Sequence, residues 1–400
     1  MTDPEATAVP GDEPPPTLRQ VLRAMDVSEA EIEQARRDGT ASLLAIEHLV
    51  LTDPPEMDLD ELTRRAAVSP EQVADLWRAL GFADPMPGEK VFTKADVEML
   101  DLVTGLIDSG VAEPDLVLQM TRVVGSSIAR IALAQIEAFG LDDETDEAAS
   151  SSEVLDSPDF AERAGVVLPT MPKVMAYVWQ RHMQAAARSR VLRAATVPQE
   201  GSPQAVGFAD LVGFTALSQQ VSAHELAEVV SRFEGLAYDT VARLGGRVVK
   251  MIGDEVMFNV VDPRQAAEIA LTLAETYRDD DELSDVRVGL AYGPVLEREG
   301  DCFGPVVNLA SRIVGIAFPG TVVVSDELHA AMVDDDDFVW RSLHRRQLKD
   351  IGRVMLWTIR RSSDPFGPKS RRDRARLERT ERFEEAVERR TDRGGRHSAD

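Results

Sequence analysis

Two patterns of apolar residues divide the chain. From Leu18 to about Phe139, apolar residues recur at the spacing of amphipathic helices, with Gly and Pro between the segments and no strand-like alternation. From Val206 onward, short β-rich runs alternate with helical segments. Because 400 residues exceed what one core usually covers, the pattern predicts two domains in the α+β class.

Punctuation along the chain predicts where helices and domains begin and end. Ser69 should cap a helix whose first turn holds Pro70, with Gln72 reaching back in a capping box and Gly81 as the stop. We expect five segments: 1–17 disordered, 18–195 a helical regulatory domain with long helices over 114–139 and from about 172, 196–205 a linker, 206–361 a catalytic domain, and 362–400 a charged, disordered tail.

Composition narrows the class of protein. With 44 Lys+Arg against 70 Asp+Glu, the net charge of -26 would repel a nucleic-acid backbone. The single cysteine, Cys302, cannot form an intramolecular disulfide, and the N-terminus has no apolar stretch typical of a signal peptide. No run of about 18 uncharged apolar residues predicts a membrane span. We therefore expect a cytoplasmic protein with no membrane partner.

The helical half offers one alternative function. Residues 59–100 resemble a MerR-type winged helix-turn-helix, which would make the chain a transcriptional regulator with a nucleotide-sensing second domain. The second helix of this motif would expose Glu71, Gln72, Asp75 and Arg78, a poor set for approaching phosphates. We favour a regulatory or dimerisation role and expect no nucleic-acid partner.

Histidines bear on regulation because their charge changes near neutral pH. His182 lies on the helix that leads to the linker, and His48 lies in the helical half. We interpret both as ordinary surface or packing residues, since proton sensing requires a partner that the sequence does not identify.

Two aspartates mark the chemistry of the second half. The run VGFADL predicts a strand ending near Asp210, and the following turn contains Gly213, which lets the N–H groups of residues 212–215 approach phosphate oxygens. The runs RVVKMI and EVMFNV flank Gly253-Asp254 as in a tight hairpin. If that hairpin lies beside the first strand, Asp210 and Asp254 converge and favour a divalent cation. Taken singly, each aspartate is more simply a turn or strand-end residue.

A helix supplies the second group of polar residues. Asn308 and Arg312 are four residues apart in VVNLASRIVGIA, so they share one helix face, and an amide beside a guanidinium suits charge growing on a phosphoryl group. The order β-α-β-β-α-β with a terminal hairpin predicts a ferredoxin-like α/β sandwich.

Three blocks, FADLVGFT, KMIGDEVM and DCFGPVVNLASR, resemble the signatures of class III adenylyl/guanylyl cyclase catalytic domains, over roughly residues 206–360. The resemblance implies two Mg²⁺ or Mn²⁺ ions per active site. It also implies the following roles: metal binding by Asp210 and Asp254, base selection by Lys250 and Asp301, ribose and transition-state contacts by Asn308 and Arg312, and triphosphate contacts by Gly213, Phe214, Thr215 and Lys349.

The implied base can be checked chemically. Adenine offers an acceptor at N1 and a donor at N6, which match a lysine donor and an aspartate acceptor, whereas guanine presents the reverse. Lys250 with Asp301 therefore predicts ATP as the substrate. Gly253-Asp254-Glu255 also suggests a palm-type diguanylate cyclase, but Lys250 and the Asn308/Arg312 helix do not belong to that pattern.

The resemblance further implies a homodimer. Asp210, Asp254 and the phosphate turn would come from one subunit and the remaining site residues from the other, and the ribose 3′-hydroxyl would attack the α-phosphorus to form cyclic AMP and pyrophosphate. Near QRHMQ, the helical half resembles the autoinhibitory domains of soluble pH-responsive bacterial cyclases.

Overall fold

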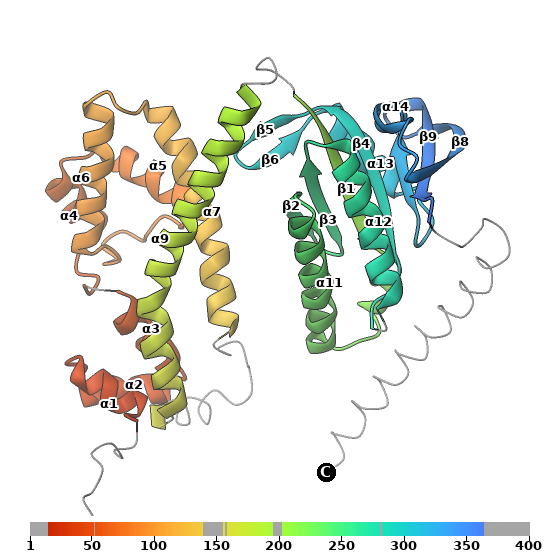
Figure 1. Cartoon of the computed structure of the whole chain (residues 1–400). Coiled ribbons are helices and arrows are strands. Elements are labelled where there is room, and N and C mark those ends of the chain that lie inside the picture. Colours follow the sequence, from red (N-terminus) through yellow and green to blue (C-terminus); the bar gives the residue numbers. More distant parts are fainter. Residues whose placement is uncertain are drawn as a thin grey trace, which may run out of the picture. The chain divides into compact units, whose positions relative to one another are not determined.

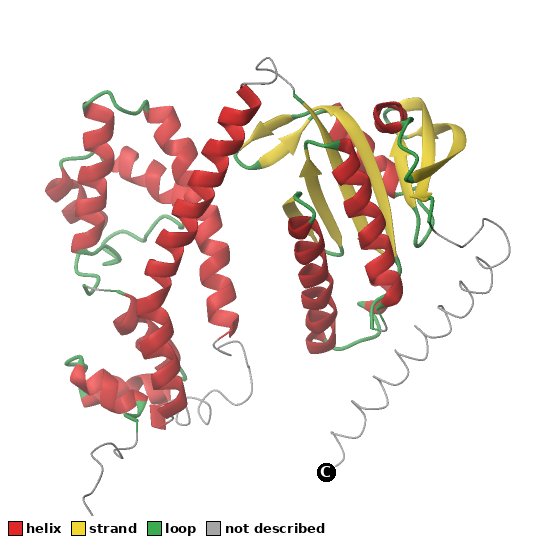
Figure 2. Cartoon of the chain, viewed as in Figure 1, coloured by secondary structure: helices red, strands yellow, loops and turns green. Residues whose placement is uncertain are grey.

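The computed structural model describes residues 15–51, 53–138, 155–156, 158–194, 202–280 and 282–363. Contacts divide the chain into two units, Met1–Ser189 and Arg190–Asp400. Helices build the first unit, and a mixed sheet with helices builds the second (Figure 2), so the predicted α+β class is confirmed. Three predicted segments, the disordered N-terminal segment, the linker and the disordered tail, lie largely outside the described residues, which omit 1–14, 195–201 and 364–400.

The first unit contains two small apolar cores. Leu18, Leu22 and Ile32 are fully buried in one, and Met57, Leu62 and Phe92 are buried in the other. Its helices are α1 (Leu18–Ala24), α2 (Glu29–Arg37), α3 (Ala41–Val50), α4 (Leu59–Ala66), α5 (Pro70–Leu80), α6 (Lys94–Asp108), α7 (Pro114–Ala138) and α9 (Pro158–Ala194) (Figure 1).

The capping prediction for α5 is confirmed. Ser69 accepts from the Gln72 N–H, the Gln72 side chain accepts from the Ser69 N–H in return, and Gly81 ends the helix with a φ of 98°. Glu71, Gln72, Asp75 and Arg78 are exposed, as predicted. The Arg78 guanidinium already pairs with Asp75 at 2.8 Å and with Asp84 at 3.0 Å, so this face carries little uncompensated positive charge.

The prediction for the start of α9 is wrong. The helix begins at Pro158, not near Pro172, and it includes both Pro169 and Pro172. Each proline lacks the N–H that would bond to a carbonyl one turn earlier. Neighbouring side chains such as those of Val166 and Tyr177 are each 62% exposed, so water can reach this part of the helix and solvate the carbonyls.

By length and composition alone, residues Pro114–Glu137 of α7 could cross a membrane. Charged Arg122 and Arg130 interrupt the stretch, which is why the sequence predicted no span. On one side α7 packs closely against α5: a Cβ added at Gly125 would lie 2.4 Å from the carbonyl oxygen of Leu80. Part of the helix surface is therefore occupied by another helix of the same unit.

A seven-stranded sheet with the strand order β2-β3-β1-β4-β7-β9-β8 forms the second unit. The predicted strand at Asp210 and the predicted hairpin at Gly253-Asp254 are confirmed. The strands are β1 (Pro203–Leu211), β2 (Arg247–Ile252), β3 (Glu255–Val260), β4 (Val286–Pro294), β7 (Val322–Ser325), β8 (Phe338–Leu348) and β9 (Gly352–Arg361). Because β1 begins at Pro203, residues 203–205 are strand and not the linker that we predicted.

Helices cover both faces of this sheet. Long helices α11 (Ala223–Arg243) and α12 (Pro263–Asp279) pack on one face, and α13 (Pro305–Val314) packs on the other (Figure 1). Contact between α13 and β4 is close at Gly289, where an added Cβ would lie 2.4 Å from the backbone nitrogen of Val314. Short helices α10 (Phe214–Leu217) and α14 (Asp326–Met332) follow β1 and β7.

Candidate active site

Asp210 lies near the end of β1, on the face of the sheet that α13 covers. Strand residues alternate between faces, and Val206 and Phe208, four and two positions earlier, belong to the core beneath α13. Directly opposite Asp210 on β4 is Arg287, whose Nε lies 2.5 Å from Asp210 Oδ2. The side chain of Asp210 is only 15% exposed, so it is largely shielded from bulk water.

The β2–β3 hairpin brings two further carboxyl groups to this place. Gly253 has a φ of 62°, and the carbonyl of the next residue, Asp254, accepts from the Leu211 N–H at 3.0 Å, which holds the turn against β1. On the next strand Glu255 pairs in register with Asp210. The predicted convergence of Asp210 and Asp254 is therefore present, with Glu255 added.

The electrostatics of the cluster favour a cation. Burial and the neighbouring charge of Asp210 raise the pKa of Asp254, although a hydrogen bond to its own backbone and Arg287 act against this. Burial, followed by the charges of Asp210 and Asp254, raises the pKa of Glu255 to about 7. Like charges in a partly buried site disfavour ionisation until a positive charge compensates them, and Arg287 compensates them only in part.

The oxygen-only donor set fits a hard divalent ion. Carboxylates are the ligands that Mg²⁺ and Mn²⁺ prefer. In the described part of the chain, no three acidic, histidine or cysteine side chains come close enough to form a complete cage. An ion at this place would therefore need ligands from water or from substrate phosphates, which is the usual condition for Mg²⁺.

The predicted phosphate turn follows β1 directly. Gly213 has a φ of 81° and open space around its Cα, so it is the backbone conformation that calls for glycine here. Thr215 is exposed, while the side chain of Phe214 packs against the core. One of the four N–H groups that we expected to approach phosphate oxygens is not available, because the Val212 N–H donates to the carbonyl of Asp285 at 2.9 Å.

Lys250 and Asp301 are in direct contact. Lys250 Nζ lies 2.5 Å from Asp301 Oδ2, and the Cys302 N–H donates to Asp301 Oδ1 at 2.8 Å. Burial acts to raise the pKa of Asp301, but these hydrogen bonds outweigh it and the pKa lies below its ordinary value. Aspartate 301 is therefore held as an ionised acceptor beside a lysine donor.

Asn308 and Arg312 face away from their own sheet. Helix α13 buries Val306 and Ala310 against the sheet, so Asn308 and Arg312 fall on its exposed side. Arginine 312 extends toward the β8–β9 turn, where it lies 3.6 Å from Asp350, next to the exposed Lys349. The fold thus places these two residues together, as predicted, but on the opposite side of α13 from the surface that packs over β1.

Sequence reasoning missed Arg287 and Glu255. Both are recognised only from the pairing of β1 with β3 and β4, which places them opposite Asp210. Alternation within VRVGLAYG could have marked Arg287 as a charge on a buried strand, but it could not identify the partner.

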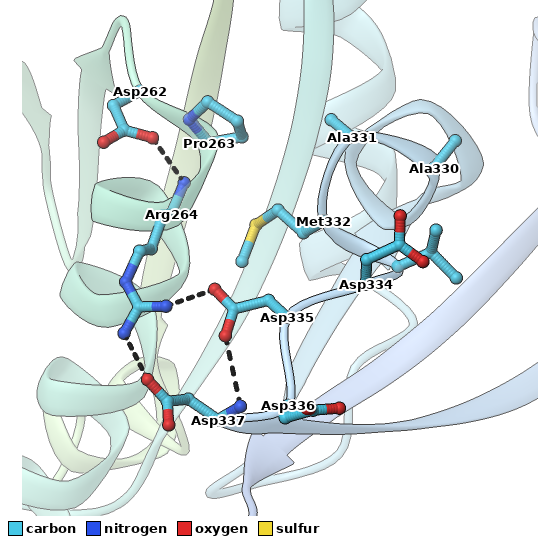
Figure 3. A pocket seen from close by; sticks show the side chains of 11 residues that line it. Asp262, Pro263, Arg264, Ala330, Ala331, Met332, Asp334, Asp335, Asp336 and Asp337 are labelled. Atoms are coloured by element: carbon cyan, nitrogen blue, oxygen red, sulfur yellow. Dashed lines mark hydrogen bonds and ion pairs between the residues drawn. The ribbon is translucent and has the colours of Figure 1, made fainter.

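A pocket elsewhere in this unit contains none of the predicted residues. It lies where α12 begins, beside the end of α14 and the loop to β8 (Figure 3). Arg264 contacts Asp335 and lies 2.5 Å from Asp337 there, and Asp262 caps α12. These contacts join two segments far apart in the sequence, and we assign them a structural role.

Comparison with known proteins gives the following findings. Residues 197–361 match the adenylate and guanylate cyclase catalytic domain. The chain is 39% identical over 284 residues to an adenylate cyclase of Streptomyces coelicolor, covering 70% of this chain and 73% of that protein. It is 33% identical over 347 residues to a pH-sensitive adenylate cyclase of Mycobacterium tuberculosis, covering 84% and 86%. Adenylyl cyclase CyaB from P. aeruginosa superposes with a TM-score of 0.37 at 20% identity, covering 42% of this chain and 98% of that chain.

Proposed function

The chain belongs to the class III adenylyl and guanylyl cyclases, and we propose that it converts ATP into 3′,5′-cyclic AMP and pyrophosphate. The observation that carries the choice of ATP is the contact between Lys250 and Asp301, with 2.5 Å between Nζ and Oδ2. A lysine donor beside an ionised carboxylate complements the N1 acceptor and N6 donor of adenine. Relatives named adenylate cyclases at 39% and 33% identity support the same choice.

Each group of residues has a separate task in this reaction. Asp210 and Asp254 would hold divalent Mg²⁺ or Mn²⁺, which when bound neutralises the triphosphate and lowers the pKa of the ribose 3′-hydroxyl. Asn308 orients the ribose, and Arg312 stabilises charge that develops at the α-phosphorus as the hydroxyl attacks and pyrophosphate leaves. The turn at Gly213 contacts the departing phosphates, and so does the side chain of Lys349.

A product assay tests the proposed reaction. Purified full-length protein is incubated with ATP or GTP, with Mg²⁺ or Mn²⁺ in separate series, and the cyclic nucleotide is quantified. We expect more cyclic AMP from ATP than cyclic GMP from GTP. An absence of cyclic AMP with both metals, from folded protein, would reject the proposal.

We further propose that the active enzyme is a homodimer with two shared sites. Asn308 and Arg312 lie on the exposed side of α13, whereas Asp210 lies on the sheet face that α13 covers. A second subunit that faces α13 can bring its own carboxylates to these residues, and two-fold symmetry then forms a second, equivalent site.

Complementation tests the shared site. Neither Asp210→Ala nor Asn308→Ala should form cyclic AMP efficiently alone. Mixing the two inactive chains should restore up to about a quarter of wild-type activity, because random pairing makes half the molecules heterodimers with one intact site each. Activity that stays at the level of the single variants would show that each chain holds a complete site.

We propose that the helical half regulates the reaction and that the protein acts in the cytoplasm. The match to the pH-sensitive relative spans both halves of the chain, which supports pH as the signal. His182 is exposed on α9, the helix that runs toward the catalytic half in sequence, and His48 is half-buried on α3.

Sedimentation of cell extracts tests the proposed cytoplasmic location. We expect the protein in the supernatant, and recovery in the membrane pellet would contradict the proposal.

A further inference from the structure

Asp301 lies on a hairpin that is separate from the main sheet. Strands β5 (Leu296–Arg298) and β6 (Asp301–Phe303) pair only with each other and form their own two-stranded sheet. At the turn, Glu299 and Gly300 have φ values of 55° and 81°, as in a type I′ hairpin. Because no backbone ladder joins this hairpin to the seven-stranded sheet, its position relative to Lys250 depends on packing and side-chain contacts.

Arg247 on β2 makes the first of these contacts. Its NH1 donates to the carbonyl of Gly300 at 2.7 Å, and its NH2 lies 3.5 Å from Glu297 Oε1. One guanidinium therefore holds both the turn and the first strand of the hairpin. Gly300 directly precedes Asp301, so the contact acts one residue from the carboxylate.

Asn259 on β3 makes the second contact, from the interior. Only 4% exposed, it lies opposite Arg247 in the β2–β3 register. Its Nδ2 donates to Glu297 Oε1 at 3.1 Å, lies 3.4 Å from Cys302 Sγ, and donates to Gln204 Oε1 of β1 at 2.8 Å. Buried polar groups with several partners define one geometry, because an unpaired group would be costly.

We propose that Arg247 and Asn259 are positioning residues that fix the β5–β6 hairpin, so that Asp301 faces Lys250 at the distance that distinguishes adenine from guanine. This inference rests on the proposed function, since it assigns base selection to Asp301. Neither residue touches the base itself. They act through the hairpin, and their loss changes selectivity because a displaced acceptor no longer matches one base better than the other.

The test compares two arginine variants of the full-length protein. Arg247→Ala removes the contacts to Gly300 and Glu297. Arg243→Ala is the matched control, because Arg243 is a 60% exposed residue of α11 that pairs only loosely, at 3.7 Å, with Asp239. The readout is the ratio of kcat/KM for ATP to kcat/KM for GTP.

We expect Arg247→Ala to lower this ratio by about tenfold, while Arg243→Ala leaves it unchanged. Arg247→Lys should restore part of the ratio, since lysine can reach one acceptor but not bridge two. An unchanged ratio in Arg247→Ala would overturn the proposal. Asn259→Ala should lower the ratio in the same way, measured at a temperature where circular dichroism shows it folded.

A double variant separates this inference from the proposed function. Asp301→Ala alone should abolish the preference for ATP, and adding Arg247→Ala should then change the ratio no further. A further fall would show that Arg247 does not act through Asp301. If Asp301→Ala keeps the preference for ATP, base selection by Asp301 fails, whereas a loss of preference in Asp301→Ala but not in Arg247→Ala rejects only the positioning role.

Discussion

Two aspartates of the catalytic half each pair with an arginine but differ in their surroundings. Asp210 contacts Arg287 and also meets the charges of Asp254 and Glu255, so its cluster carries excess negative charge. Asp280, at the end of α12, pairs with Arg232 at 2.7 Å and accepts from two backbone N–H groups. The first arrangement suits a ligand that brings positive charge, whereas the second is complete and stabilises the fold.

Asp280 predicts a pH-dependent contribution to stability. Burial acts to raise its pKa, but hydrogen bonds from Arg232 and from the N–H groups of Glu282 and Leu283 hold it below the ordinary value. A carboxyl with a lowered folded-state pKa stabilises the protein above its unfolded pKa of about 4, and the contribution is lost as the pH falls through the folded pKa.

Asp280→Asn should therefore lower stability by about 1 kcal/mol at pH 7, and the difference from the wild type should shrink below about pH 4. Urea unfolding across this range measures it. The neighbouring Asp279→Asn, at a side chain that is 74% exposed, serves as the control and should have little effect. A difference that grows on acidification would contradict the assignment.

At the scale of elements, α13 is the part that connects fold and chemistry. It buries Val306 and Ala310 against the sheet and presents Asn308 and Arg312 on its other side. Its distance from the sheet is set at Gly289 of β4, which leaves no room for a side chain beneath the helix. The position of the two polar residues therefore depends on a glycine that is not itself part of the site.

Gly289→Ala should push α13 outward. The new Cβ would lie 2.4 Å from Val314 N and 2.8 Å from Ala310 O, and backbone atoms cannot rotate aside. We expect a loss of about 1 to 3 kcal/mol in stability, with a fall in kcat.

The control for this variant is Gly235→Ala in α11, where nothing lies within 4 Å of the added Cβ. That change should stabilise the protein by about 0.5 to 1 kcal/mol, because alanine favours helix. Thermal unfolding and activity measure both variants. Equal effects of the two substitutions would refute the role given to Gly289.

For the whole molecule, the proposed regulation requires the helical half to act on a dimeric catalytic half. Helix α9 begins at the apolar core of the first unit, where Ala161 is 5% exposed, and continues to Ala194, five residues beyond the end of that unit at Ser189. The side chains of residues 176–188 are exposed. A long helix between the two halves can carry rotation or melting from one to the other.

This arrangement predicts a pH response that depends on the helical half. Between about pH 6 and 8, the activity of the full chain should change more than that of a fragment containing residues 202–363, because histidine changes charge in this interval. Cyclic AMP formation at fixed metal concentration measures both, and His182→Ala in the full chain tests that residue separately. Parallel profiles of chain and fragment would exclude a pH signal from the helical half.

Local features of the chain could be predicted from the sequence alone. Helix capping at Ser69, the turn at Gly253-Asp254 and the shared face of Asn308 and Arg312 depend on residues within one or two turns of each other, so composition and spacing determine them. The same reasoning failed at Pro172, which lies inside α9 although proline usually marks the start of a helix. Whether water can solvate the carbonyl groups that a proline leaves unbonded depends on what surrounds the helix, and the local sequence does not show this.

Tertiary structure alone decided how those features meet. Pairing of β1 with β3 and β4 placed Glu255 and Arg287 opposite Asp210, and it set Arg247 and Asn259 side by side beneath the Asp301 hairpin. Strand pairing joins residues far apart in the sequence, and its register follows from the burial of whole sheet faces. The charges and contacts that arise at such pairings therefore belong to the folded chain and not to any single segment of it.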